Sequence, residues 1–232
     1  IYAPWKDTIN VTGGTFNITG GAGIVARAGN VTVTNAVFNT TGNATGKVGD
    51  SRVVVPCSAI VFDSEAAYPA LTNTSAISVE GGTFTSEADA ISVVKPEGEG
   101  AAERVSVTGG TFSSDVRAYA AGDTPVAATG EQEGTYVVGQ SAINAVAKAG
   151  NNVRIVKGNV TLTDVPAGVT VIPGEGTVVF VNGKDISGNQ YSDGYTVPQS
   201  SGYYYYQPTT DTKTTDTKGS PKTFDAGIAL YV

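Results

Sequence analysis

Three carboxylates, Glu87, Asp89 and Asp115, are the side chains whose type and spacing best fit chemistry. Glu87 and Asp89 are two residues apart, so they lie on one face of an extended strand. Asp115 occupies the equivalent region one repeat further on, and together the three predict a small acidic patch. Polysaccharide hydrolysis needs two carboxylates roughly 5–10 Å apart. Arg117 is the nearest cation and no basic cluster accompanies the patch, so we expect a solvated acidic surface, not a catalytic site.

Composition excludes most other active-site chemistry. The 232-residue chain contains no His and a single Cys. Ser-His-Asp and Cys-His catalysis, His-ligated zinc, thiolate metal centres and an intrachain disulfide are therefore ruled out. A net charge of −7 without a basic cluster argues against nucleic-acid binding. We expect no metal, no other cofactor, and a buried, apolar role for Cys57.

An eight-residue phrase ending in Gly-Gly-Thr-Phe recurs along the first half of the chain. It occupies residues 9–16, 77–84 and 105–112, with a degenerate copy at 31–38. The closing phenylalanines are 22, 46 and 28 residues apart, so one repeat is about 22–28 residues and one carries an insertion. A second phrase alternates with the first, at residues 1–3, 23–26, 59–62 and 90–93. Both phrases alternate apolar and polar residues, which predicts short strands.

A repeat of this length without intervening amphipathic helices indicates a parallel β-solenoid, in which the strands of successive coils pair. Ile, Val and Phe are then expected to point inward and stack, while Thr, Ser and Asn face out or form ladders. The Gly-Gly pairs predict bends. An antiparallel β-sandwich built from hairpins is the alternative all-β fold. It explains the alternation but not the repeated Gly-Gly-Thr-Phe.

The chain divides into three predicted parts. Residues 1–140 form the coils, and insertions at 42–56 and 63–75 are either binding loops or tolerated excursions. Residues 141–186 begin with a short helix, followed by strands that form further coils or a cap. Residues 187–232 form a Tyr/Thr-rich spacer of low complexity.

The spacer contains two distinctive stretches. Four consecutive tyrosines at 203–206 could form an aromatic ligand platform, dock on the end of the coils, or lie within the spacer. The Asp/Thr/Lys repeat at 209–218 has too little apolar content to fold and is expected to be solvated. At the other end, Ile1 is expected to follow a cut inside a larger chain or a cleaved signal peptide.

Asn-x-Ser/Thr triplets are frequent. In a eukaryotic secreted protein they would be glycosylation acceptors. In an Asn- and Thr-rich solenoid we interpret them as ladder and turn residues. The asparagines concerned are Asn10, Asn17, Asn30, Asn39, Asn43, Asn73 and Asn159.

A short motif near the C-terminus resembles the cell-wall sorting signal of Gram-positive bacteria. Ser220, Pro221, Lys222 and Thr223 fit the pentapeptide in which a sortase joins the Thr to peptidoglycan. Phe224 stands where that family has Gly. The resemblance implies anchoring to the cell wall, or a retained membrane anchor if sortase does not cleave.

The Gly-Gly-Thr-Phe coils of residues 1–186 are similar to those of β-helix surface proteins of gut Firmicutes. This resemblance implies a right-handed parallel β-helix in an extracellular protein of the cell surface. We therefore expect a non-enzymatic adhesin or binding module whose partners are host glycans, mucin or host protein. A polysaccharide lyase or hydrolase and a purely structural stalk are the alternatives.

Overall fold

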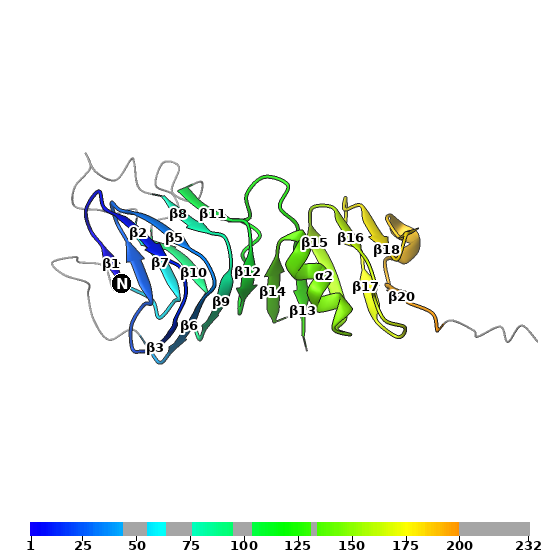
Figure 1. Cartoon of the computed structure of the whole chain (residues 1–232), viewed down its shortest axis with the longest axis horizontal. Helices are drawn as coiled ribbons and strands as arrows, with labels where there is room; N and C mark the ends of the chain where they lie inside the picture. Colours follow the sequence, from blue (N-terminus) through cyan, green and yellow to red (C-terminus); the bar gives the residue numbers. More distant parts are fainter. Residues whose placement is uncertain (44–54, 64–75, 95–103, 131–133, 200–232) are drawn as a thin grey trace, which may run out of the picture. The chain divides into compact units, whose positions relative to one another are not determined.

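The computed structural model describes residues 1–43, 55–63, 76–94, 104–130 and 134–199 (Figure 1). Residues Ile1–Gln199 belong to one unit of the structure. The last part of the chain, from Ser200, lies outside the described residues, as do most of the predicted insertions at 42–56 and 63–75. The secondary structure of the described part is mostly β.

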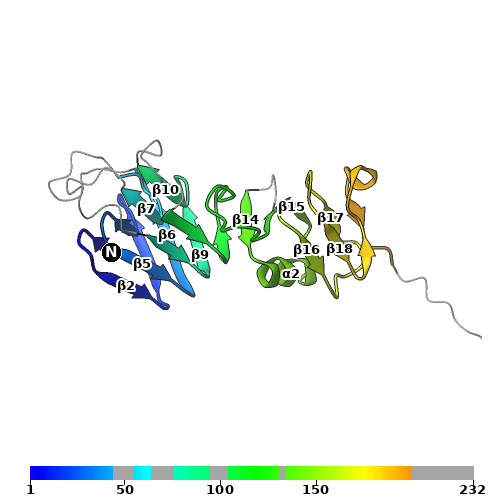
Figure 2. The ribbon, with the colours of Figure 1, turned by 90° about the horizontal axis from the view of Figure 1, so that it is seen from above.

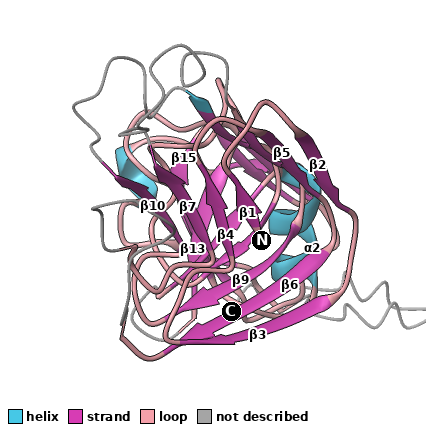
Figure 3. Cartoon of the chain, turned by 90° about the vertical axis from the view of Figure 1, so that its left-hand side faces the viewer, coloured by secondary structure: helices cyan, strands magenta, loops and turns pink. Residues whose placement is uncertain are grey.

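Within the described residues, the chain visits three sheets in the same order four times, and the strands of successive visits pair in parallel. The first sheet contains β1 (Tyr2–Ala3), β4 (Ile24–Ala26), β7 (Ile60–Asp63) and β10 (Ile91–Val94). The second sheet contains β2 (Thr8–Val11), β5 (Asn30–Val33), β8 (Ile77–Val79) and β11 (Val105–Val107). The third sheet begins with β3 (Thr15–Thr19), β6 (Ala36–Thr41), β9 (Gly82–Ser86) and β12 (Gly110–Phe112). Figure 3 shows the three sheets around a common interior.

One strand from each sheet makes one coil, and the parallel pairing between coils confirms the stacked architecture for this part of the chain. The hairpin sandwich is wrong here, because consecutive strands lie in different sheets and do not pair with each other.

The phenylalanines that close the repeat stack on one another as predicted. Phe16, Phe38, Phe84 and Phe112 occupy matching registers on β3, β6, β9 and β12. Neighbouring ring centroids are 4.7, 5.8 and 4.9 Å apart, and the rings are within 11° of parallel. Outside this ladder, Asn39 Nδ2 donates to Asn17 Oδ1 at 2.9 Å. The triplet asparagines at these positions are therefore ladder residues.

An antiparallel hairpin interrupts the parallel stacking after the fourth coil. It consists of β13 (Val126–Thr129) and β14 (Thr135–Val138), and β14 pairs antiparallel with β12. Val126 and Val138 pack into the core of the coils, whereas Ala127 and Val137 pack into a second core. Because side chains alternate along a strand, one hairpin seals both cores. The hairpin lies between the coils and the predicted helix, and the sequence analysis did not predict it.

The expected short helix is α2 (Gln140–Lys148), and it packs against β14, β15 and β16 (Figure 2). Parallel pairing then resumes between β15 (Val153–Lys157) and β17 (Thr170–Ile172), and between β16 (Val160–Leu162) and β18 (Val179–Val181). The chain ends its described part with β19 (Lys184–Asp185), the 3₁₀ turn η3 (Asn189–Tyr191) and β20 (Tyr195–Thr196).

The folded part extends further than the predicted spacer boundary at residue 187. Strand β20 pairs with β17, and Tyr191 and Tyr195 pack against the second core. Val197 is also buried there. These aromatic and apolar contacts hold a segment whose sequence shows no strand-like alternation.

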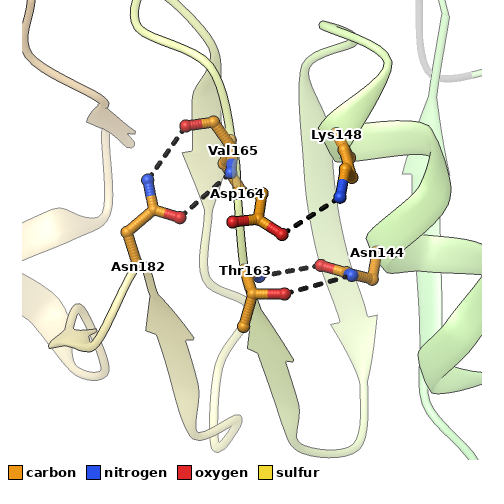
Figure 4. Close-up of polar contacts among 6 residues, drawn as sticks. All are labelled: Asn144, Lys148, Thr163, Asp164, Val165 and Asn182. Carbon is orange, nitrogen blue, oxygen red and sulfur yellow. Dashed lines mark hydrogen bonds and ion pairs between the residues drawn. The ribbon is translucent and has the colours of Figure 1, made fainter.

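Side-chain amides cover the open edge of β16, where another coil would otherwise pair. Gln140 Nε2 donates to the Thr161 carbonyl at 2.6 Å, and the Thr161 amide donates to Gln140 Oε1 at 3.0 Å. Asn144 accepts from the Thr163 amide at 2.8 Å and its Nδ2 faces Thr163 Oγ1 at 3.4 Å (Figure 4). On the opposite side, Asn182 accepts from the Val165 amide and donates to the Val165 carbonyl.

Candidate functional site

A groove follows the corner of the stack at which strands of the second sheet turn into strands of the third. It has a volume of about 430 Å³. It is lined by the stacked pairs Gly81–Gly82 and Gly109–Gly110 and by the beginning of α2. The polar side chains of the lining are those of Asn35, Glu80, Thr108, Thr111, Gln140 and Ser141.

Glycine is required at this corner for two physical reasons. Gly82 and Gly110 have φ of 123° and 124°, a region that L side chains rarely adopt. A Cβ on Gly109 would collide with the carbonyl oxygen of Glu80 in the coil before it. Successive coils therefore approach each other through bare backbone, and the recess over that backbone is the groove.

The second coil departs from the motif at this corner, because Asn35 stands where the other coils have the first Gly. Asn35 has φ of 53°, which Asn tolerates better than most residues. Its side chain is exposed and lines the groove beside Gly81. In the second coil, formed by the degenerate copy of the repeat at residues 31–38, the corner therefore carries a side-chain amide.

The groove suits a ligand that is rich in hydroxyl groups. Its lining offers hydroxyls, amides and exposed backbone, and Glu80 is the charged side chain among its lining residues in the described structure. The amide of Gln140 is already bonded to Thr161. Hydrogen bonding to a neutral chain therefore fits the lining better than recognition of a strongly charged group does.

The structure places the three predicted acidic residues on neighbouring coils. Ser114 Oγ accepts a hydrogen bond from the Ala90 amide at 2.7 Å, which sets the segment of Asp115 beside that of Asp89. All three carboxylates are exposed. Glu87 Oε2 accepts from the Gly42 amide at 2.8 Å and so joins its coil to the second coil.

Asp115 forms a local ion pair with Arg117. The guanidinium Nε lies 2.8 Å from Asp115 Oδ2, and the Arg117 amide donates to Asp115 Oδ1 at 2.9 Å. Partial burial acts to raise the pKa of Asp115, but the hydrogen bonds and charge of Arg117 outweigh it, so this pKa lies below its usual value. Burial, with the nearby charge of Asp89, raises the pKa of Tyr119. Within the described residues, no three Cys, Asp or Glu side chains are grouped to hold a metal ion.

The structure contains a buried ion pair that the sequence repeats did not predict. Arg27 Nε lies 2.7 Å from Asp63 Oδ2, with the side chains 8% and 5% exposed. Arg27 also donates to the Tyr2 hydroxyl at 3.2 Å. Burial acts to lower the pKa of Arg27, but the Tyr2 hydrogen bond and the Asp63 charge raise it overall. The sequence contained the information needed to predict this pair. Ile24, Val25 and Ala26 align with Ile60, Val61 and Phe62, and the next residues in this register are Arg27 and Asp63.

Three sets of predicted functional residues lie outside the described structure. Residues 44–54 and 64–75, the bulk of the two insertions, lie outside the described structure. The anchor-motif residues Ser220, Pro221, Lys222, Thr223 and Phe224 also lie outside it, as does the tyrosine run at 203–206. Cys57 is described and is buried, as expected for a small apolar side chain.

No family model, curated protein or solved structure shows a significant match to this chain. No helix in the described residues has both the length and the apolar content needed to span a membrane.

Proposed function

We propose that this protein is a non-enzymatic binding module of a bacterial cell surface, and that a neutral glycan chain binds in the groove at the glycine corner. The observation that carries the proposal is the groove itself. It crosses successive coils, its lining includes bare glycine backbone, and its polar side chains are hydroxyls and amides with one carboxylate, beside the apolar Val138 and Ala142. Host glycans and mucin are the partners this chemistry fits.

The stacked coils explain how modest contacts would suffice for adhesion. The corner repeats from coil to coil, so a polymer lying along it meets similar groups several times. Many copies presented on one surface then add their weak affinities, because each further contact is made at high effective concentration. The net charge of −7 favours neutral over polyanionic ligands.

The cellular part of the proposal rests on the sequence resemblance. We propose that the coils wind right-handed and that the segment Ser220–Phe224 attaches the protein to peptidoglycan or to a membrane. A host protein is an alternative partner of the groove.

Two other functions remain as competing hypotheses. In a polysaccharide lyase or hydrolase, Glu87, Asp89 or Asp115 would act on the bond. The ion pair of Asp115 and the coil-bridging role of Glu87 favour structural roles for both. In a structural stalk, the ring stack of Phe16, Phe38, Phe84 and Phe112 would serve stiffness alone.

Matched glycine variants test the groove without disturbing the fold. A Cβ on Gly81 makes ordinary contacts with Asn35, and one on Gly13 meets nothing within 4 Å. Both residues are the first Gly of a Gly-Gly pair, but Gly81 lines the groove. We expect Gly81→Leu to weaken glycan binding about tenfold or more by filling the groove, and Gly13→Leu to bind like the wild type.

Binding would be measured by titrating the chain with mucin glycans, plant polysaccharides and bacterial polysaccharides, with released reducing ends and unsaturated products assayed in the same wells. Saturable binding that only Gly81→Leu weakens supports the proposal. Equal binding by both variants would move the site away from the groove. Product formation would establish an enzyme, and the absence of both binding and product would favour the stalk.

A further inference from the structure

Two residues of the groove depart from the pattern that the other coils follow at the same positions. Asn35 stands where the first, third and fourth coils have the first Gly of the pair. Glu80 stands directly before the pair of the third coil, where the other coils have a threonine. The threonines that share its register are Thr12, Thr34 and Thr108. Asn35 and Glu80 both line the groove.

The two departures lie side by side on neighbouring coils. Val33 pairs with Val79 in the second sheet, so the chain that leads to Asn35 runs next to the chain that leads to Glu80. A Cβ on Gly81, the residue after Glu80, would lie 3.7 Å from Asn35 Oδ1. Adjacent strands are about 4.8 Å apart, a distance that one sugar ring spans. A single sugar that lies across the two coils therefore reaches both side chains.

Neither side chain holds the coils together. Asn35 and Glu80 are exposed, and neither forms a side-chain hydrogen bond or ion pair in the described structure. Other polar groups of the lining are engaged, because the Gln140 amide bonds to β16 and Thr108 Oγ1 donates to the Val79 carbonyl at 3.4 Å. Residues that break a repeat without stabilising it are expected at functional sites.

We propose that Asn35 and Glu80 recognise one neutral sugar of the bound glycan through two adjacent hydroxyl groups, an inference that rests on the proposed function of the groove. A carboxylate only accepts hydrogen bonds, and its two oxygens can take one from each of two neighbouring hydroxyls. The Asn35 amide can donate to one of these hydroxyl oxygens and accept from another hydroxyl. Because hydrogen bonds to an ionised group are the stronger ones, Glu80 should contribute more affinity than Asn35.

The charge of Glu80 also determines what the groove rejects. A sialic acid, a uronic acid or a sulfated sugar in the same place would bring two negative charges together, with no cation among the described lining residues to compensate. The threonine of the other coils would bond to a sugar hydroxyl without this discrimination. Glu80 is thus a specificity-determining residue that favours neutral over acidic glycans.

Variants that restore the repeat remove the recognition residues and keep the fold. Glu80→Thr and Asn35→Gly each introduce the residue that the matching coils carry. Asn35 has φ of 53°, a conformation that Gly adopts readily, so Asn35→Gly should fold like the wild type. Val37→Thr is the matched control, because it also restores a repeat position but does not change the lining of the groove. The residues in register with Val37 are Thr15, Thr83 and Thr111.

Binding would be measured by titrating the full chain with desialylated mucin glycans and galactomannan as neutral probes, and with sialylated mucin glycans as the acidic probe. We expect Glu80→Thr to weaken binding of the neutral probes about tenfold or more, and Val37→Thr to change it by less than about twofold. Asn35→Gly should weaken it by about three- to tenfold. Circular dichroism and thermal melting would confirm that each variant is folded.

Two further measurements address the charge and the hydroxyl pair. Glu80→Gln keeps the shape of the side chain without its charge, so it should raise the affinity for sialylated relative to desialylated mucin glycans by about tenfold. Periodate cleaves the carbon–carbon bond between adjacent hydroxyl groups. Galactomannan that is oxidised with periodate and then reduced should therefore lose binding to the wild type, whereas a mock-treated sample keeps it.

The outcomes separate this inference from the proposed function. If Glu80→Thr and Asn35→Gly bind the neutral probes as tightly as the wild type while Gly81→Leu does not, the recognition pair is wrong and the groove remains the site. Unchanged binding of oxidised galactomannan would overturn the hydroxyl pair, and an unchanged preference in Glu80→Gln would overturn the role of the charge. A wild-type chain that binds none of the neutral probes would overturn the proposed function and the recognition pair together.

Discussion

Strands β4 to β9 of the coils each lie between two other strands, whereas β16 in the second half has a strand on one side and a helix on the other. In the coils, backbone groups pair with backbone groups, and phenylalanines stack in matching registers. At β16, the amides of Gln140 and Asn144 take the place of the missing strand.

The geometry of a helix allows this substitution. Four residues of an α-helix advance about 6.0 Å, and two residues of a strand advance about 6.6 Å. Gln140 and Asn144 are four apart on α2, and their partners Thr161 and Thr163 are two apart. Each side-chain amide can donate through its NH₂ group and accept through its oxygen, as the backbone of a strand residue donates and accepts. The comparison shows that a stack of coils can be ended by side chains as well as by a folded cap.

The first prediction compares the middle of the phenylalanine ladder with its end. Phe84→Ala removes a ring that is 0% exposed and stacked on both faces, so we expect a loss of about 3–5 kcal/mol in the free energy of unfolding. Phe16→Ala removes a half-buried ring that stacks on Phe38 alone among the described residues, and should cost about 1–2 kcal/mol. Urea denaturation followed by circular dichroism measures both.

Equal losses for the two variants would contradict the idea that the core weakens toward the first coil. The same titrations show whether the two halves unfold together. Because the β13–β14 hairpin contributes to both cores, we expect a single transition in each case.

The second prediction compares an ion pair in the coils with one at α2. Asp63→Ala leaves Arg27 buried and without its carboxylate, so we expect a loss of about 3–5 kcal/mol. Lys148→Ala breaks an ion pair with Asp164 whose side chains are 58% and 70% exposed, and should cost about 0–1 kcal/mol. Denaturation at low and high salt distinguishes them, because screening affects mainly the exposed pair.

A loss below about 1 kcal/mol for Asp63→Ala would show that Arg27 finds other compensation in the coil. In the wild type, burial acts to lower the pKa of Arg27, but the Tyr2 hydrogen bond and the Asp63 charge raise it overall, and this variant removes the Asp63 contribution. An arginine guanidinium is nevertheless protonated throughout neutral and mildly alkaline conditions. Raising the pH to 9 should therefore not relieve the loss by discharging Arg27.

The repeats allowed much of the first half to be predicted. Gly-Gly-Thr-Phe predicts a bend followed by a phenylalanine whose ring points inward. The spacing of this motif along the chain therefore predicted the coils, their strands and the phenylalanine ladder. The Arg27–Asp63 pair could also have been found, by extending the strand alignment one residue past Ala26 and Phe62.

Other features depend on three-dimensional context that spacing does not encode. Alternation in residues 126–138 fits parallel and antiparallel pairing equally well, so the hairpin was missed. The groove arises only when glycine corners stack on each other and α2 docks beside them. In the sequence, Gln140 and Asn144 look like ordinary polar helix residues. Their contacts with the edge of β16 depend on how α2 packs against that strand.

The last prediction tests the helix as a substitute for a strand. In Gln140→Ala with Asn144→Ala, the Thr161 and Thr163 groups at the edge of β16 lose their partners. We expect a loss of about 1–3 kcal/mol, since each hydrogen bond contributes roughly 0.5–1.5 kcal/mol. Ser141→Ala, at an exposed position of the same helix turn, should change stability by less than about 0.5 kcal/mol.

The exposed edge should also change how the chain associates. A bare edge of β16 offers a strand for pairing, so the double variant should associate more strongly than the wild type as its concentration rises, measured by light scattering. Ser141→Ala leaves both amides in place and should associate like the wild type. Equal association of the double variant and the wild type at every concentration would show that β16 stays covered, and that apolar packing of α2 alone protects the edge.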